Sequence, residues 1–289
     1  MKQISNYDAA IIGAGASGLA AALTVKKYKP GASVLVLEKK ERAAKKLAAT
    51  GNGRCNLSNE ACENKDVVFG FFSENGIMLR KDESGRFYPC SEDAGQLASL
   101  LTEETVSAGV RIRLDSEVKK VEACPEGGFL LLVEEKGTER TVYAKKLLIA
   151  AGGKSYPSMG TTGDGYVMAR RLGHGITPPA PGLTAVCTEM KELQTLKGVR
   201  AKAKVCLKFE GKQLFSEEGE IQFRSDSVSG ICVMNLSNHM KPHGSMSFDG
   251  YVIAADFAPF CDEKELTAYM KAMQTKQGLS VCDALKSLI

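Results

Sequence analysis

The sequence predicts an α/β protein in which a parallel sheet carries an antiparallel β-meander, followed by a β-rich part and a short helical segment. Three observations support this fold class. An apolar run at 9–12 leads directly into GAGASG at 13–18, and the next apolar run, at 34–37, ends on Glu38. Three strand patterns later follow one another with no room for helices between them. From residue 183 onward, the chain shows further strand patterns of its own.

The glycine-rich turn fits a site for the diphosphate of a dinucleotide. Gly13 permits the tight turn from strand to helix, Gly15 lets backbone amides approach the phosphates, and Gly18 lets the helix pack closely on its strand. The phosphates would lie at the N-terminus of a helix that runs to about Tyr28, where unpaired amides and the helix dipole favour an anion. The alternative is an ordinary tight turn before a helix, but the preceding strand and the position of Glu38 favour the nucleotide.

Glu38 stands at the end of the second strand, about 20 residues after the last glycine of the turn. Its carboxylate can accept hydrogen bonds from both ribose hydroxyls of adenosine and would repel a 2′-phosphate. The kind of dinucleotide stays open at this point, since an NAD dehydrogenase can begin in the same way. The strand patterns at 117–123, 129–135 and 140–144 favour an FAD-type domain, because turns this short force an antiparallel meander where an NAD domain has another helix.

Length, composition and charge limit the class of protein. With 289 residues, of which 44% are hydrophobic, the chain is long enough for one large domain or two smaller ones. The formal net charge of +4 is small and both signs of charge are interleaved, so we expect small-molecule partners and no nucleic acid. No apolar stretch approaches the roughly 18 residues of a membrane helix, and residues 1–8 lack a signal-peptide pattern. We therefore expect a cytoplasmic protein without membrane association.

The cysteines and histidines predict neither a metal site nor a redox-active disulfide. Nine cysteines are scattered singly with no CxxC pair, which is typical of reduced thiols in the cytosol. Disulfide reductases, which also bind FAD, need two closely placed cysteines, so this class is disfavoured. The histidines, His174, His239 and His243, have no metal-ligand spacing with the cysteines.

A turn-rich loop, TGNGRCNLSN at 50–59, is a second candidate part of the site. The glycines on either side of Asn52 allow positive φ, and Arg54 and Asn56 offer donors for a carbonyl or phosphate group, as the polar edge of a flavin requires. The basic stretch before this loop, 39–46, is interpreted as a solvated face, with a direct phosphate contact by one of its lysines as the alternative.

Local residues also predict one strand end and two helix starts. An uninterrupted apolar strand at 147–153 ends in two glycines, and Gly152 falls where ligands bind in open α/β sheets, although a plain tight turn is the alternative. Asp164 can cap the helix that follows it, contact the cofactor, or do both. Ser91 is expected to cap a helix over 92–108.

A proline-rich stretch at 178–182 marks a boundary along the chain. Beyond it, 201–210 alternates strictly, and shorter strands are predicted at 213–215 and 220–223. From residue 263 onward the pattern is helical. The predicted domains are an FAD-binding, Rossmann-like domain at 1–182, a β-rich domain at 183–262, and an incomplete helical segment at 263–289 that ends in a helical pattern at 281–288.

In their order and spacing, the motifs resemble a bacterial flavoprotein family that includes 3-dehydro-bile-acid Δ4,6-reductase and aminoacetone oxidase. The motifs that carry the resemblance are GAGASG, TGNGRCNLSN, GRFYPCS at 85–91, AAGGKSYPSMGTTGDGY at 150–166, GEIQF at 219–223 and SGI at 229–231. The resemblance implies FAD, an FAD domain interrupted by a β-rich insert with a helical part, and redox chemistry on a small organic substrate. TGDG before a helix also resembles succinate dehydrogenase and fumarate reductase flavoproteins, in which that aspartate lies close to the cofactor.

The resemblance assigns residues to the two ends of FAD. The diphosphate and adenosine end is assigned Gly13, Gly15, Ala16, Ser17, Gly18, Glu38, Lys39 and, through its backbone, Val118. The flavin side is assigned Asn52, Gly53, Arg54, Cys55, Asn56 and Asp164. Two departures stand out. Ala44 occupies a place where the family usually has glycine, and the glycine-rich segment with which family members re-enter the first domain is absent, so weakened FAD retention is expected.

The predicted function is that of an FAD-dependent oxidoreductase acting on a small organic substrate, by NAD(P)H-linked reduction of an enone or dienone or by oxidation of an amine. Because no second GxGxxG occurs, NAD(P)H would be a transient electron donor at the substrate face. No catalytic residue is identified; Arg86, Tyr88 and Tyr156 are loop residues near the expected flavin for which simple packing is the alternative. The alternative function is a truncated, catalytically silent nucleotide-binding protein, and an RNA-modifying flavoenzyme ranks third because no basic surface pattern supports it.

Overall fold

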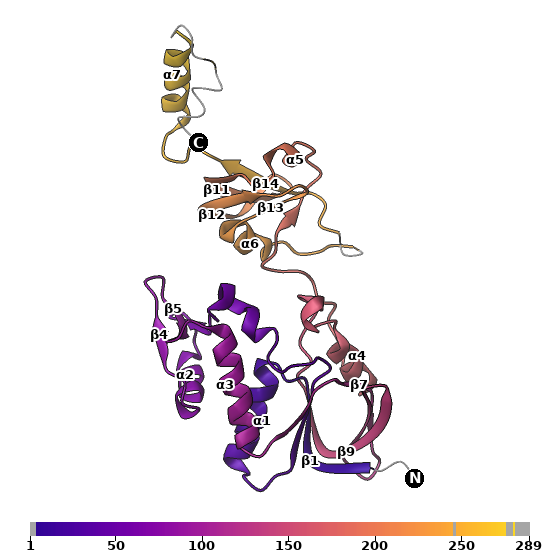
Figure 1. The fold of residues 1–289 in the computed structure, drawn as a ribbon. Coiled ribbons are helices and arrows are strands. Elements are labelled where there is room, and N and C mark those ends of the chain that lie inside the picture. Colours follow the sequence, from indigo (N-terminus) through magenta and orange to yellow (C-terminus); the bar gives the residue numbers. More distant parts are fainter. Residues whose placement is uncertain (1–3, 245–246, 276–279, 281–289) are drawn as a thin grey trace. The chain divides into compact units, whose positions relative to one another are not determined.

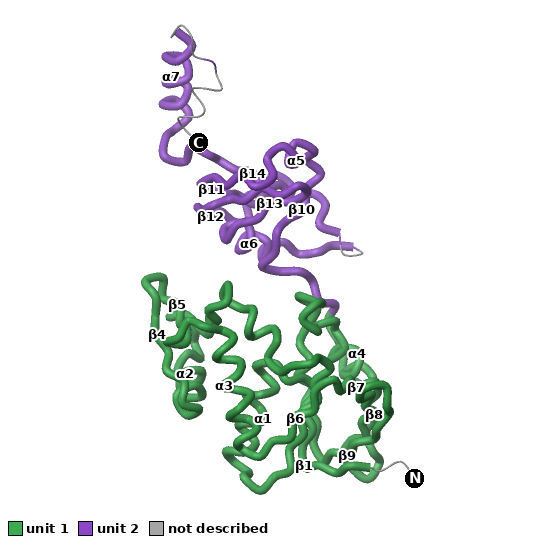
Figure 2. The backbone as a smooth tube through the Cα atoms, viewed as in Figure 1, with its two compact units in different colours: residues 1–177 green, residues 178–289 purple. Residues whose placement is uncertain are grey.

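The computed structural model describes residues 4–244, 247–275 and 280, and the chain divides into two compact units, residues 1–177 and 178–289 (Figure 2). Unit 1 holds a six-stranded and a three-stranded sheet, and unit 2 holds a five-stranded sheet. Each unit has hydrophobic core residues of its own. The predicted domain limits and the interpretation of the second part as an insert stay predictions.

The large sheet of unit 1 has the strand order β6-β2-β1-β9-β8-β7. Figure 1 labels its strands β1, β7 and β9. The strands of this unit are β1 (Ile4–Ile12), β2 (Val34–Leu37), β3 (Ser58–Asn59), β4 (Leu79–Lys81), β5 (Arg86–Pro89), β6 (Arg111–Arg113), β7 (Ser116–Ala123), β8 (Phe129–Glu135) and β9 (Thr138–Ile149). Its helices are α1 (Ala16–Tyr28), α2 (Lys65–Glu74), α3 (Ala94–Ser107) and α4 (Asp164–Arg171), with short 3₁₀ segments η1 (Leu47–Gly53) and η2 (Pro157–Met159). Strands β6, β2, β1 and β9 are parallel and β9, β8 and β7 are antiparallel, which confirms the predicted fold class.

The last meander strand and the apolar strand after it are one continuous strand, β9, so their separation in the sequence-based prediction was wrong. Thr138–Ala144 pairs antiparallel with β8, and Thr141–Ile149 pairs parallel with β1. Lys145 and Lys146 are exposed at the point where the strand leaves β8, and Lys145 binds the Asp8 carboxylate at 2.8 Å. In the sequence, these two consecutive lysines interrupt the apolar pattern and so suggest a turn. In the structure, the strand continues through them.

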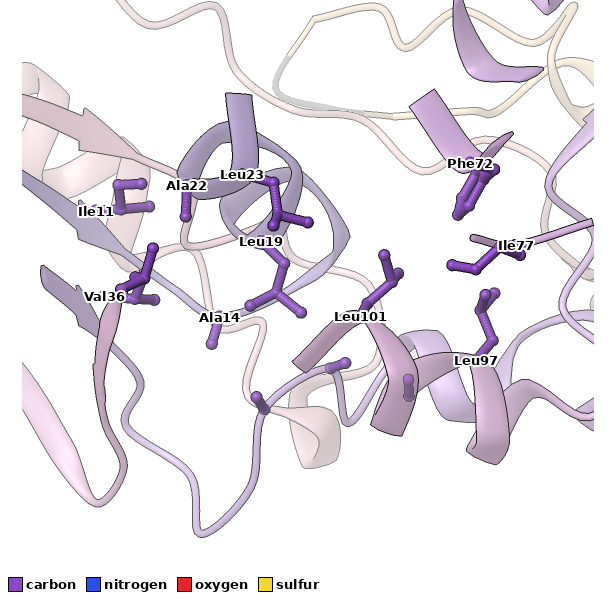
Figure 3. Packing of buried hydrophobic residues seen from close by; sticks show 14 of the residues in the cluster. Ile11, Ala14, Leu19, Ala22, Leu23, Val36, Phe72, Ile77, Leu97 and Leu101 are labelled. Atoms are coloured by element: carbon purple, nitrogen blue, oxygen red, sulfur yellow. The ribbon is translucent and has the colours of Figure 1, made fainter. Parts of the chain in front are cut away.

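Alternate residues of β1 and β2 face opposite sides of the large sheet, as the twofold period of a strand requires. On one side, Ile11 and Val36 pack with Leu19 of α1 and with Leu97 and Leu101 of α3. Figure 3 shows the α1 side chains lying between those of the sheet and Leu101. The other side packs against the meander and α4 through Ala10, Ile12, Leu35, Leu37, Val121, Leu131, Val142 and Met168. Each fully buried leucine or isoleucine contributes about 1.5–3 kcal/mol to folding.

Helix α3 is capped by Asp93 and begins at Ala94, so the prediction of Ser91 as the cap was wrong. Asp93 Oδ1 accepts hydrogen bonds from the amides of Gly95 and Gln96 at 2.7 and 2.9 Å. Glu92 has a φ of +48°, which is incompatible with a right-handed helix and delays the helix start. An aspartate at this position satisfies two of the otherwise unpaired amides of the first turn.

Unit 2 is built on an antiparallel sheet with the strand order β10-β13-β12-β11-β14. Its elements are β10 (Val186–Cys187), α5 (Leu193–Leu196), β11 (Arg200–Phe209), β12 (Lys212–Phe223), β13 (Ser227–Ser229), α6 (Ile231–Ser237), β14 (Tyr251–Asp256) and α7 (Glu263–Gln274). The predicted alternation in β11 is confirmed, with Ala203, Val205 and Leu207 buried. The two short strands predicted at 213–215 and 220–223 are a single strand, β12, which pairs along the whole of β11. The helical pattern at 281–288 lies outside the described residues.

Ala44 adopts a conformation that favours glycine, and this generates a prediction about stability. Its φ is +54°, it is buried, and its amide donates to the Ala14 carbonyl at 2.7 Å. The left-handed conformation costs an L-residue about 1–2 kcal/mol, which glycine avoids. We expect Ala44→Gly to be about 1–2 kcal/mol less destabilising than Ala43→Gly, a buried neighbour without positive φ, in urea unfolding. Equal losses of stability in the two variants would contradict this expectation.

Candidate functional site

A cavity of about 340 Å³ lies where the carboxyl ends of β1, β2 and β9 meet the start of α1 and α4. The predicted ligand residues that line it are Gly13, Gly15, Ala16, Ser17, Glu38, Lys39, Val118, Gly152 and Asp164. The predicted residues outside its lining are Gly18, Asn52, Gly53, Arg54, Cys55 and Asn56. The tertiary structure therefore brings together predicted residues from five separate segments and leaves the predicted flavin loop, apart from Thr50, out of the wall.

The three glycines of the turn differ in the steric reason for which a side chain is absent. Gly13 has a φ of +102°, and a Cβ added there would lie 2.5 Å from the Ala150 carbonyl oxygen. A Cβ on Gly18 would lie 1.9 Å from the Gly13 carbonyl oxygen, so the close packing of α1 on the turn requires glycine. Gly15, in contrast, has no atom within 4 Å of such a Cβ, which leaves open space in front of its backbone. No side chain caps α1, so the amides of its first turn stay available to a ligand.

Glu38 is held in place by two backbone amides. Its Oε2 accepts from the Ala14 amide at 2.8 Å and its Oε1 accepts from the Lys40 amide at 3.0 Å. Each carboxylate oxygen has a second acceptor site, so the group can still accept hydrogen bonds from a ligand. The carboxylate is therefore oriented before any ligand arrives.

Lys39 and Asp164 form an ion pair at the wall of the cavity. Lys39 Nζ lies 2.5 Å from Asp164 Oδ2 and 2.8 Å from Thr162 Oγ1, and Thr162 Oγ1 donates to Asp164 Oδ1 at 2.8 Å. Partial burial opposes ionisation of Asp164, but the hydrogen bonds from Lys39 and Thr162 outweigh it and hold the pKa of Asp164 below its ordinary value. Asp164 is the first residue of α4 and its oxygens are occupied in this way, so the prediction that it caps the helix was wrong.

Lys46 is a cavity residue that sequence reasoning missed. Its Nζ donates to the Ser155 carbonyl at 3.3 Å and lies 3.4 Å from Thr161 Oγ1, so it links the basic stretch to the segment before α4. The predicted basic stretch contained this residue, but nothing in the sequence distinguished it from the neighbouring lysines. Only its long-range partners, more than 100 positions away, set it apart.

The loop at 50–56 is tightly folded and hides its thiol. Asn52 and Cys55 have positive φ, and a Cβ on Gly51 would lie 2.5 Å from the Asn56 amide nitrogen. Cys55 is fully buried, and Thr50 Oγ1 donates to its Sγ at 3.3 Å. Burial raises the pKa of the Cys55 thiol, so it is protonated at neutral pH and is a poor nucleophile.

Other features of the described residues bear on the class of site. A larger cavity of about 450 Å³, lined by α2 and the β4–β5 hairpin, is apolar apart from Ser73 and contains none of the predicted ligand residues. Within residues 4–244, 247–275 and 280, no three His, Cys, Asp or Glu side chains are grouped as metal ligands require. In the same part of the chain, no helix has the length and apolar character needed to cross a membrane.

A family model described as HI0933-like protein Rossmann domain matches residues 7–70 and 63–239. The chain belongs to this family. It is 32% identical over 285 residues to the 3-dehydro-bile acid delta(4,6)-reductase of Clostridium scindens, covering 92% of this chain and 67% of that protein. It is 28% identical to the ribosomal RNA dihydrouridine synthase of Escherichia coli, covering 83% of this chain and 62% of that protein. The chain thus spans about two thirds of the length of these relatives.

The membership confirms the predicted family and places the chain among FAD-dependent oxidoreductases. Among solved structures, the open conformation of a flavocytochrome c3 fumarate reductase aligns with a TM-score of 0.46 and 17% identity, covering 68% of this chain and 47% of that one. Thermovibrio ammonificans THI4 aligns with a TM-score of 0.44 and 17% identity, covering 80% of this chain and 79% of that one.

Substitutions at Gly15 and Gly18 are expected to affect different properties, FAD binding at Gly15 and folding stability at Gly18. We expect Gly15→Ala to keep the stability of the wild type within about 0.5 kcal/mol, because the added methyl group meets no protein atom. If the diphosphate binds at this turn as predicted, the same variant should bind FAD at least tenfold more weakly, since the methyl group would occupy the open space in front of the amides. Gly18→Ala should instead lose about 3 kcal/mol of stability through its backbone clash.

Urea unfolding and flavin fluorescence titration measure the two effects. Normal FAD affinity in Gly15→Ala would contradict the assignment of this turn to the diphosphate. Normal stability in Gly18→Ala would contradict the packing argument.

The ion pair of Lys39 and Asp164 predicts a pH dependence of stability. The folded protein lowers the pKa of Asp164, so the ionised carboxylate adds to the free energy of unfolding. This stabilisation is fully present above the ordinary carboxyl pKa of about 3.9 and is lost as the pH falls through the lowered pKa of the folded state. Asp164→Asn should therefore be less stable than the wild type by up to about 1 kcal/mol at pH 7, and the gap should close below about pH 4. Urea unfolding across this pH range checks the expectation, and 1 M salt should narrow the gap at pH 7. A gap that widens in acid would contradict it.

Proposed function

We propose that the chain binds FAD in the 340 Å³ cavity and forms the cofactor-binding part of an NAD(P)H-linked reductase. Its substrate would be a small organic molecule with a carbon–carbon double bond conjugated to a carbonyl group. The observation that carries the proposal is the oriented Glu38 carboxylate, 2.8 Å from the Ala14 amide and next to the uncapped start of α1. This pairing of an acceptor for ribose with donors for phosphate suits an adenine dinucleotide without a 2′-phosphate.

The donor and acceptor set along the cavity fits the parts of FAD in order. The amides at Gly15–Ser17 would hold the diphosphate and Glu38 the adenosine ribose, while the backbone of Val118, at a bulge in β7, would meet the adenine. Asp164 and Lys39 would lie along the ribityl chain, where carboxylate and ammonium groups can bind its hydroxyls. When bound, FAD supplies the hydride chemistry, and the residues of this chain bind and orient it and exclude water.

Direct reduction by a nicotinamide is favoured over a thiol relay. The Cys55 thiol is buried and protonated, and the eight cysteines that the structure describes are all free. A relay needs two thiols that exchange with a disulfide beside the flavin. With no second GxGxxG in the sequence, NAD(P)H would bind transiently on the substrate face.

The similarity to a reductase supports reduction over oxidation of an amine. The relative with 32% identity is named a delta(4,6)-reductase, and dihydrouridine, the product named in the other relative, carries two added hydrogens. We infer the same direction of electron flow here. A small enone or dienone is preferred to RNA as substrate because the net charge of this chain is only +4.

Reconstitution with FAD tests the proposal directly. Purified protein mixed with FAD should quench flavin fluorescence, and NADH or NADPH should bleach the bound flavin under anaerobic conditions. Adding a 3-oxo-Δ4,6 bile acid should restore the flavin absorption, whereas a uridine-containing RNA should not. Aminoacetone donates electrons, so it is added to the oxidised flavin in place of NAD(P)H, and it should not bleach the flavin. Failure to bind FAD would overturn the proposal, and oxidation of the reduced flavin by RNA alone would reassign the substrate.

Glu38 provides the matched variant for this experiment. Glu38→Ala should weaken FAD binding roughly tenfold or more, since it removes charge-assisted hydrogen bonds to the ribose. Glu41→Ala is the control, because Glu41 is an exposed carboxylate that pairs with Lys45 and lies outside the cavity lining. Equal FAD affinity in the two variants would contradict the role of Glu38.

A further inference from the structure

Three arginines and two carboxylates gather where the loop at 50–56 meets the β4–β5 hairpin. Arg54 lies with its guanidinium 4.6 Å from the centre of the Tyr88 ring, and its Nη1 is 3.9 Å from Glu92 Oε1. Arg80 Nη2 reaches the same Glu92 oxygen at 2.5 Å. Arg86 and Asp82 form the remaining pair, with Nε and Oδ2 3.3 Å apart. The cluster has three positive and two negative groups and so carries one net positive charge.

The Arg54 guanidinium is fixed in position but is not saturated. Tyr88 is only 2% exposed, so it offers a rigid ring face on which the cation stacks. Arg80 stands directly opposite Tyr88 across the β4–β5 pair, which puts both side chains on one face of the hairpin. The 3.9 Å distance to Glu92 is too long for a hydrogen bond, and in the part of the chain that the structure describes the Arg54 side chain has no hydrogen-bond acceptor. Its side chain is 44% exposed and can therefore meet a ligand.

Glu92 occupies the space between the two arginines at a conformational cost. Its φ is +48°, in the left-handed region that costs an L-residue about 1–2 kcal/mol. Such strain persists where the surrounding structure requires it, often at binding sites. One carboxylate oxygen shared by two guanidinium groups leaves most of their N–H donors unused.

The cluster is close in sequence and in space to the cavity proposed for FAD. Thr50 lines that cavity, and its carbonyl accepts from the Cys55 amide at 3.0 Å, while the Gly51 carbonyl accepts from the Arg54 amide at 3.2 Å. The loop thus turns back within five residues. A group bound on Arg54 would lie one tight turn from the cavity wall.

We propose that Arg54 and Arg80 bind the carboxylate of the organic substrate, and that Glu92 occupies this place until the substrate arrives. The assignment rests on the proposed function for the identity of the ligand. A planar guanidinium fork matches a carboxylate in two-point contact. The single net positive charge of the cluster suits a monoanionic carboxylate better than a dianionic phosphate ester.

Calorimetric titration of a 3-oxo-Δ4,6 bile acid and its methyl ester tests the assignment, because the two ligands differ only in the negative charge. The wild type should bind the acid about tenfold or more tightly than the ester. Arg80→Ala, at a residue outside the cavity lining and not assigned to FAD, should largely remove this difference while keeping FAD affinity within twofold. Glu92→Gln should bind the acid more tightly than the wild type and the ester equally well. A purely structural role for the cluster would weaken binding in both variants. The control is Arg140→Ala, since the Arg140 side chain has similar exposure and pairs with Glu135 at 2.6 Å within the β8–β9 hairpin.

Equal affinity of the wild type for acid and ester, or no binding of either, would overturn the assignment. Weaker binding of the acid to Glu92→Gln would overturn it as well. Uridine 5′-monophosphate and uridine form a second pair of ligands that differ in negative charge. If the protein binds the monophosphate more tightly than uridine but binds the bile acid and its ester equally, the arginines bind phosphate instead. Because calorimetry does not require flavin, a failure here is distinct from a failure to bind FAD, which fluorescence titration of the same samples reports.

Discussion

The close packing of α1 on the turn before it is the constraint on which the rest of the site depends. A Cβ on Gly18 would stand 1.9 Å from the Gly13 carbonyl oxygen, so only glycine allows this contact. The contact sets the first turn of the helix at the carboxyl edge of the sheet, where Gly15 faces open space. It also brings the Ala14 amide within 2.8 Å of Glu38. One steric requirement therefore provides both a helix end suited to an anion and the carboxylate beside it.

Two consecutive residues after β2 connect the two halves of the cavity. Glu38 accepts from the Ala14 amide of the glycine turn, whereas Lys39 reaches Thr162 before α4 and Asp164 at its start. Asp164 is ionised in this pair, so the wall opposite the turn carries a neutralised pair of charges. The end of a single strand thus orders groups that are more than 120 residues apart in the sequence.

The loop at 50–56 and the glycine turn contribute different kinds of chemistry. The turn offers backbone amides, which suit any diphosphate. The loop buries its Cys55 thiol and presents Arg54 on the face of Tyr88, which provides a fixed cation without a reactive sulfur. This division agrees with a protein in which a bound cofactor transfers the electrons and the side chains bind and orient.

The sequence by itself determined the strand, turn and helix at 9–28, the acid at Glu38 and the meander, because each follows from local spacing and turn length. It also identified part of the cavity wall, from the glycine turn to Asp164, but not Lys46. Only the tertiary structure decided that β9 is one strand, that Lys39 and Lys46 reach the segment before α4, and that Arg54 stacks on Tyr88 instead of lining the cavity. These contacts join residues far apart in the chain, and their partners depend on how whole elements pack, which no local pattern of residue types encodes.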